Sequence, residues 1–172
     1  ALVEAAGDVD ILVNNAGLTR DGLRARMSDD DWAAVLDTNL AGPFRCARRA
    51  SKGMIRLRRG RIILISSVVG LYGGPGQANY AAAKAGVQAM MRVLSREGAR
   101  RGIRANAIAP GVIDTAMAAT IPEDVRAGML RNVPLGRFGR TDEVAAVALF
   151  LCSPLASYLT GQTIEVNGGW RG

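Results

Sequence analysis

Short apolar runs alternate with longer amphipathic stretches along this chain. Apolar runs of four to seven residues that end in polar or glycine-rich turns predict strands at 9–13, 61–66, 103–109 and 163–166. Stretches with apolar residues at helical spacing predict helices over 28–59, 78–101, 122–131 and 141–152. This alternation is typical of an α/β fold with a parallel sheet of about four strands.

Several residues predict where the helices begin and bend. Ser28, followed by three aspartates, matches a helix N-cap with an acidic first turn. We expect the helix that follows to bend near residues 42–43, where a glycine precedes a proline. The glycines of 70–76 predict a loop, and Thr141 predicts a plain N-cap without a full capping box.

The composition excludes several classes of chemistry. The 172 residues include no histidine, so a Ser-His-Asp relay, a Cys-His pair and histidine-dependent zinc motifs are excluded. The two cysteines, Cys46 and Cys152, cannot form a cysteine-only metal cluster, and we expect no metal site. No apolar run approaches the length of a membrane span, and no signal peptide opens the sequence. We expect one cytoplasmic domain over 1–172 with Tyr, Lys, Asp or Glu as acid or base.

The net charge of +7 is concentrated in one region. No acidic residue occurs from 38 to 96, and eight of the eleven basic residues in that window lie between Arg45 and Arg61. Only three aromatic residues accompany them, so the stacking platforms of single-strand binding are lacking. We interpret this basic cluster as a solvated helix face or as a docking surface for an acidic partner, and we expect no nucleic acid and no membrane as partners.

Tyr80 and Lys84 are the strongest candidates for chemistry. They lie four positions apart on one face of the predicted 78–101 helix, and Ser67 ends the preceding strand. A phenol is a poor acid–base catalyst near neutral pH, and a nearby ammonium lowers its pKa by stabilising the phenolate. A Tyr-x-x-x-Lys spacing alone is more often a chance surface pair. Here, however, four chain segments place polar or glycine-rich turns at one edge of the sheet.

Six spaced motifs run through the chain in order. They are ILVNNAGLTRDGL (11–23), DTNLAGPF (37–44), GRIILISSVVG (60–70), GQANYAAAKAG (76–86), NAIAPGVIDTAM (106–117) and LTGQTIEVNGG (159–169). Together they resemble the short-chain dehydrogenase/reductase superfamily, and within it most closely the 3-oxoacyl-[acyl-carrier-protein] reductases. The resemblance implies a Rossmann-like, doubly wound parallel sheet and a homo-oligomer, a tetramer or dimer, built through the 28–59 and 77–101 helices.

The resemblance also implies a role for each matching residue. Tyr80 would donate a proton as hydride reaches a carbonyl carbon, Ser67 would orient that carbonyl, and Lys84 would hold the nicotinamide ribose and lower the pKa of Tyr80. Asn39 would hold a water that links Lys84 to solvent. The cofactor, NADPH (NADP) with NAD as the alternative, would also contact Asn15, Ala16, Gly17, Pro110, Gly111, Ile113 and Thr115. For these residues, turn geometry alone is the competing explanation.

The implied substrate is a 3-oxoacyl thioester on acyl carrier protein, reduced to the 3-hydroxyacyl form in fatty acid biosynthesis. Acyl carrier proteins are acidic, so the basic cluster suits them, and Arg58 and Arg101 match docking arginines near the active-site mouth. The 116–134 loop would form a substrate lid. Two alternatives stay open: a short-chain dehydrogenase of another alcohol or ketone, such as a sugar or steroid, and an inactive oligomerisation module.

The family's opening strand and its Thr-Gly-x-x-x-Gly-x-Gly turn have no counterpart in this sequence. That turn places backbone N–H groups on the cofactor pyrophosphate. We expect an N-terminally truncated sheet, about two-thirds of the family's domain, with one unpaired apolar flank. A fragment of a longer enzyme, a natural truncation and completion by a partner chain all explain this. We favour the fragment because every downstream catalytic position is intact.

Overall fold

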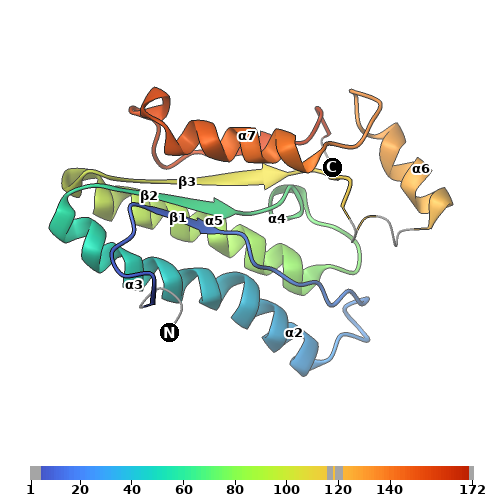
Figure 1. Ribbon diagram of the computed structural model, residues 1–172. Coiled ribbons are helices and arrows are strands. Elements are labelled where there is room, and N and C mark those ends of the chain that lie inside the picture. The colour runs from blue at the N-terminus through green and yellow to red at the C-terminus, as the bar shows by residue number, and fades with distance from the viewer. Residues whose placement is uncertain (1–4, 116–117, 119–121, 171–172) are drawn as a thin grey trace.

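The structure, a computed structural model, describes residues 5–115, 118 and 122–170. A parallel sheet forms the middle of three layers, with α7 on one face and α3 and α5 on the other (Figure 1). The sheet has the strand order β1-β2-β3-β4, and every neighbouring pair is parallel. The strands are β1 (Ile11–Asn14), β2 (Gly60–Ile65), β3 (Ile103–Pro110) and β4 (Thr163–Val166). The predicted α/β class with four parallel strands is confirmed.

The helices lie close to their predicted places. They are α2 (Asp29–Leu36), α3 (Gly42–Leu57), α4 (Val69–Tyr72), α5 (Ala78–Gly98), α6 (Glu123–Arg131) and α7 (Thr141–Cys152). Short 3₁₀ segments follow α5 (Ala99–Arg101) and α7 (Pro154–Ala156). Ser28 is the N-cap of α2, as predicted, and its hydroxyl oxygen accepts the N–H of Asp31 at 3.1 Å.

Both faces of the sheet are buried under helices, as the apolar strands predict. Ile62 and Leu64 of β2 pack with Met91 of α5 in one apolar cluster. Ile63, which lies between them in the sequence, packs with Leu151 of α7 on the opposite face. Because successive strand residues point to opposite faces, one continuous apolar run fills both cores and fixes the sheet between its two helix layers.

The structure differs from the prediction over 70–76, where a loop is expected, because α4 occupies the start of this region. A Cβ on Gly70 would lie 2.7 Å from the carbonyl carbon of Lys84, so a glycine at this position lets α4 pack directly against α5. Gly73, with a φ of 79°, ends the short helix. Glycine in the sequence does not distinguish a loop from a close approach between two helices.

Two helix ends also differ in detail. Between α2 and α3 the chain forms a π-helical turn over Asp37–Ala41, just before residues 42–43, where the sequence predicts a bend. Pro43 is the second residue of α3 and directly follows this π-helical turn. At α7 the N-cap is Arg140 and not Thr141, because Arg140 has an extended backbone (φ −97°, ψ 156°) and Thr141 is the first helical residue. The Glu143 carboxylate accepts the Arg140 N–H at 2.7 Å, a capping-box bond that the sequence does not predict.

One edge of the sheet is apolar and exposed. Within the described residues β1 pairs with another strand on one side only. Its side chains Ile11 and Val13 are 48% and 45% exposed. This matches the unpaired apolar flank that the sequence predicts.

The described residues contain neither a membrane-spanning helix nor a group of side chains placed to bind a metal ion. No helix among them is both long enough and apolar enough to cross a bilayer. This same part of the chain contains no group of three or more Cys, Asp or Glu residues placed to hold a metal ion. Cys46 and Cys152 are free thiols.

Candidate active site

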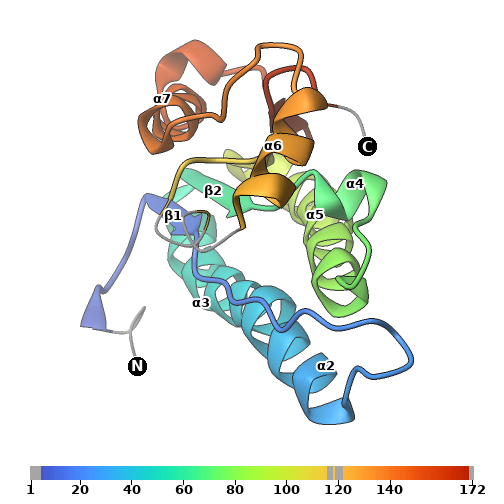
Figure 2. The same ribbon diagram turned by 90° about the vertical axis from the view of Figure 1, so that its right-hand side faces the viewer.

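A cavity of about 350 Å³ lies beyond the carboxyl ends of the strands. This end of the sheet is on the right in Figure 1, where α4, α6 and the start of α5 gather, and it faces the viewer in Figure 2. Three turns and α5 supply the lining: Asn15, Gly17, Leu18, Thr19, Ile65, Ser66, Ser67, Tyr80, Lys84, Pro110, Gly111 and Thr115. Most residues selected from the sequence therefore meet at one place.

Lys84 is a buried cation at this cavity. The residue is 4% exposed, and its ammonium donates a hydrogen bond to the carbonyl oxygen of Ile65 at 2.7 Å. Its Nζ lies 5.5 Å from the centre of the Tyr80 ring. Burial disfavours the charged form and lowers the pKa of Lys84 from 10.5 to about 8.

Tyr80 is a protonated phenol at neutral pH. Burial raises its pKa above the usual value, a side-chain hydrogen bond with Ser67 opposes this, and the Asp21 carboxylate adds to the rise. The expectation that Lys84 brings the pKa of Tyr80 below its usual value is therefore wrong for this arrangement. The Lys84 ammonium is directed to the Ile65 carbonyl, and the lowering contribution comes from Ser67.

Ser67 follows β2 and holds its hydroxyl in a fixed position. The oxygen Oγ accepts the N–H of Val69 at 3.2 Å, in the turn that begins α4. A hydroxyl has one proton to donate and two lone pairs to accept with, so the Ser67 proton is left for the Tyr80 oxygen or for a ligand. The strand end and the short helix together orient this group.

Asn39 lies behind the cavity in the π-helical turn and is 1% exposed. Its amide binds the backbone of Leu18 twice: Oδ1 accepts the N–H at 2.9 Å, and Nδ2 donates to the carbonyl at 2.8 Å. A Cβ on Gly17 would lie 3.2 Å from this Oδ1 and 3.7 Å from Lys84 Nζ. Asn39 therefore holds the turn after β1 close to Lys84, and its expected role toward water stays a prediction.

A second cavity, of about 470 Å³, adjoins the first. The two share Asn15, Ile65, Pro110 and Thr115. The other walls come from β1, the turn after β3, and α7, and they are mainly apolar: Val13, Ile113, Thr141, Val144, Ala145 and Ala148. Ile113 thus lines this cavity and not the first one. Ala16 lines neither, although it is in the turn with Asn15 and Gly17.

The expected substrate lid over 116–134 is described only in part. Residues 116, 117 and 119–121 lie outside the described residues. The later part of the segment is α6, which has no buried side chain and lies at the carboxyl end of the sheet (Figures 1 and 2). Its function as a lid stays a prediction.

Comparison with known proteins identifies the family. A family model described as enoyl-(acyl carrier protein) reductase matches residues 1–171. The chain belongs to the short-chain dehydrogenase/reductase family. This chain is therefore an oxidoreductase that acts on CH–OH and C=O groups.

Several curated relatives of this short-chain reductase carry the name 3-oxoacyl-[acyl-carrier-protein] reductase. The protein of Thermotoga maritima is 51% identical over 168 residues, which cover 98% of this chain and 68% of the relative. The Escherichia coli protein is 52% identical over 163 residues, or 95% of this chain and 67% of the relative. The chain thus spans about two-thirds of the length of these relatives.

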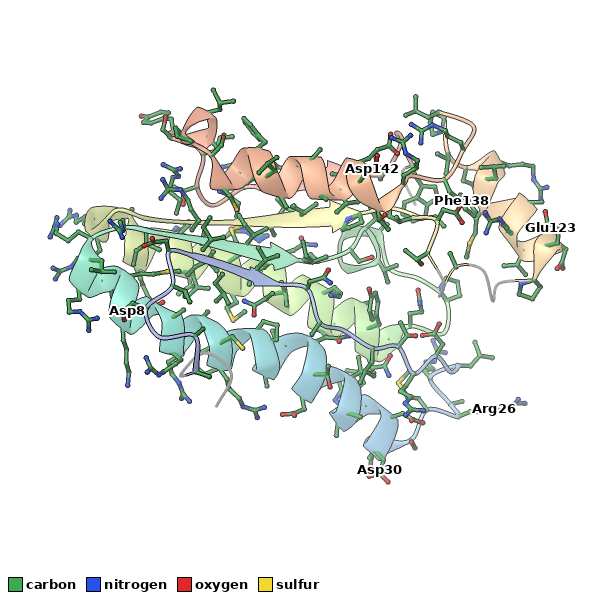
Figure 3. All side chains as sticks on the ribbon, viewed as in Figure 1. Asp8, Arg26, Asp30, Glu123, Phe138 and Asp142 are labelled. Atoms are coloured by element: carbon green, nitrogen blue, oxygen red, sulfur yellow. The ribbon has the colours of Figure 1, made fainter. Side chains whose placement is uncertain are left out.

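Arg58 and Arg101 do not lie where the sequence analysis expects them. Arg58 follows α3 and Arg101 follows α5, so both precede strands and lie at the amino ends of β2 and β3. The cavity is at the carboxyl ends, and α5, with 21 residues, spans about 30 Å between the two ends. In Figure 3, Asp8 marks the amino end on the left and Phe138 the carboxyl end on the right. The prediction that these arginines stand near the mouth of this chain's own cavity is wrong.

The basic cluster of this short-chain reductase is partly neutralised by carboxylates that the 38–96 window lacks. Three of its arginines form exposed ion pairs with aspartates from earlier in the chain: Arg45 with Asp37, Arg56 with Asp8, and Arg59 with Asp10. Exposed pairs of this kind stabilise a fold little. They do reduce the positive field below what the sequence count suggests.

The sequence does not identify three buried polar residues of α5: Asn79, Gln88 and Ser95. The Asn79 amide donates to the carbonyls of Arg20 and Asp31 at 3.0 and 3.3 Å, which ties α5 to the turn after β1 and to α2. Gln88 lies one turn beyond Lys84 and contacts the end of β2. A polar residue within the apolar stripe of a helix was the available signal.

Proposed function

We propose that this short-chain reductase converts a 3-oxoacyl thioester on acyl carrier protein into the 3-hydroxyacyl form, as a step of fatty acid biosynthesis, with NADPH as cofactor. The observation that carries the proposal is the convergence of Tyr80, Lys84 and Ser67 on one cavity. The names of the relatives support this substrate, because those proteins are about half identical to nearly the whole of this chain.

The cavities fit the nicotinamide half of such a cofactor. An ammonium has three N–H donors, and the Ile65 carbonyl accepts one from Lys84, so donors remain for the hydroxyls of a ribose. Asn15, Pro110, Gly111 and Thr115, with Ile113 in the adjoining cavity, would hold the nicotinamide and the atoms next to it. When bound, the cofactor supplies the hydride that the carbonyl carbon accepts.

Tyr80 supplies the proton that the substrate oxygen takes up in this proposal. The raised pKa keeps its phenol protonated at neutral pH, which is the form that a reduction requires. Ser67, with one lone pair already occupied by the Val69 N–H, donates its proton to the same substrate oxygen. The phenolate that remains regains a proton from solvent through Lys84 and a water held by Asn39, the roles that the family resemblance implies for these two residues.

Docking of the acidic carrier requires a second copy of the chain. Arg58 and Arg101 make no ion pair within the described residues, and they lie at the end of the sheet opposite the cavity. In a homo-oligomer built through α3 and α5, a neighbouring copy can bring these arginines to the cavity mouth. Positive charge at that place would speed association with an acidic carrier.

Cofactor binding and turnover test this function directly. Titration of the protein at its natural length with NADPH should change the cofactor fluorescence, and NADPH absorbance should fall when acetoacetyl thioester is added. Acetoacetyl-acyl carrier protein should be a better substrate than a panel of sugar, steroid and small-alcohol ketones. Tyr80→Phe is the matched variant, because it removes one hydroxyl and keeps the ring.

Two results would count against the proposal. Preference for a ketone outside the acyl thioesters would favour a short-chain dehydrogenase with another substrate. An oligomer that neither changes NADPH fluorescence nor turns over any substrate would leave the protein as an assembly module.

A further inference from the structure

Gln88 is a buried amide directly behind the candidate active site. It lies on α5, one turn after Lys84, and is 3% exposed. Its Nε2 donates to the hydroxyl oxygen of Ser66 at 2.9 Å and approaches the carbonyl oxygen of Ser67 at 3.4 Å. The side chain therefore contacts the two serines that end β2.

Ser66 links Gln88 to the backbone of α5. Its hydroxyl accepts the Gln88 N–H and donates its own proton to the carbonyl oxygen of Lys84 at 2.9 Å. The Lys84 ammonium in turn donates to the carbonyl of Ile65. Residues 65–67 are thus joined to one turn of α5 by a closed set of hydrogen bonds, in which every donor and acceptor named here is buried or nearly so.

We propose that Gln88 is a positioning residue that fixes the Ser66–Ser67 strand end against α5, so that the Ser67 hydroxyl faces Tyr80. The inference rests on the function proposed above, because Ser67 and Tyr80 carry its chemistry. An apolar side chain of the same size would fill this space with no polar group that needs a partner. The hydrogen bonds of Nε2 therefore orient the strand end, which an apolar side chain of equal volume would not do. Its effect reaches the reaction through Ser67.

Gln88→Met tests this, because methionine keeps the length of the side chain and removes both N–H donors. We expect kcat to fall roughly tenfold and the KM for NADPH to stay within about twofold. Gln162→Met is the matched control, since the Gln162 amide is exposed and donates to a carbonyl in the turn before β4. The control should keep the kcat of the unchanged protein.

A second readout does not depend on turnover. NMR of protein labelled at the tyrosine ring carbon that bears the hydroxyl follows the ionisation of Tyr80, and Tyr80→Phe assigns the signal. Because the hydrogen bond with Ser67 lowers the pKa of Tyr80, its loss in Gln88→Met should raise that pKa further. A purely structural role would lower the melting temperature and leave this titration unchanged.

Ser66→Ala provides an independent variant that removes only the hydroxyl to which Gln88 binds. It should reproduce both effects, and the double variant should lose no more than the worse single variant, because both act through one contact. If the unchanged protein shows no turnover, the proposed function fails while the titration still decides the role of Gln88. A Tyr80 titration that is the same in the unchanged protein, Gln88→Met and Ser66→Ala would overturn the inference.

Discussion

Replacing Lys84 by methionine should abolish the reaction and at the same time stabilise the fold at neutral pH. Lys84 is almost completely buried, and no carboxylate forms an ion pair with it among the described residues. Burying this ammonium without a carboxylate partner lowers the stability of the fold, because the charge is removed from water. Methionine has a similar length and no charge, so it should fill the same space.

The magnitude follows from the pKa of Lys84, which burial lowers from 10.5 to about 8. This lowering means that the charged form of Lys84 is less stable in the folded chain than in the unfolded chain by about 3 kcal/mol, relative to the neutral form. The variant also loses the hydrogen bond to the Ile65 carbonyl, worth about 1 kcal/mol. Lys84→Met should therefore raise the free energy of unfolding by about 2 kcal/mol below pH 8.

The sign of the pH dependence is also fixed. Between pH 8 and 10.5 the unfolded chain holds the Lys84 proton and the folded chain releases it, so the free energy of unfolding of the unchanged protein rises with pH. Lys84→Met should lack this rise. Urea unfolding, followed by tryptophan fluorescence between about pH 7 and pH 10.5, measures both effects.

Lys52→Met is the control, because Lys52 is exposed on α3 and is the other lysine of the chain. It should keep the pH dependence of the unchanged protein. Parallel pH curves for Lys84→Met and the unchanged protein would refute the reasoning, and so would a variant that is less stable at pH 7.

Three further predictions follow from the site and its supports. Tyr80→Phe should lower turnover by roughly 10²–10⁴-fold and keep the NADPH affinity, measured by cofactor fluorescence; retained turnover would exclude Tyr80 as the acid. Changing Arg58 and Arg101 together to Glu should raise the KM for carrier-bound substrate and leave that for a small thioester nearly unchanged, and equal effects on both would exclude docking. Asn79→Ala should lower the free energy of unfolding by about 2 kcal/mol in urea, while Asn132→Ala at the exposed end of α6 should not; equal losses would show that the buried amide has no special weight.

The periodic parts of the fold were predictable from the sequence. The apolar run of β2 agrees with the strand to within one residue. The helical spacing predicts the first residue of α5, but the α-helix ends at Gly98, and a 3₁₀ segment (Ala99–Arg101) occupies the last three residues of the predicted helix. Burial against the sheet leaves a periodic pattern that can be recognised in the sequence. Two predictions were wrong, because a glycine fits both a loop and a close helix contact, and because neighbouring residues can each serve as a helix N-cap. Gly70 permits a helix contact and not a loop, and Arg140 replaces Thr141 as the N-cap of α7.

The candidate site was predictable to a similar extent: residue spacings within one segment were visible in the sequence, whereas contacts between segments were not. The spacing of Tyr80 and Lys84 and the turns after three strands were visible in the sequence, and the order of the motifs assigned the family. Only the tertiary structure brings Ser67 to Tyr80 and ties the turn after β1 to Asn39, since these contacts join segments that are far apart in the chain.

The sequence by itself determined the α/β class, the family and the residue types that can move a proton in a chain without histidine. The tertiary structure decided the protonation of those residues and the end of the sheet at which the two arginines lie. Burial, which no single position in a sequence reports, raises the pKa of Tyr80 and lowers that of Lys84. Strand polarity places Arg58 and Arg101 at the end of the sheet away from the cavity, because residues that precede parallel strands gather at one edge and residues that follow them gather at the other.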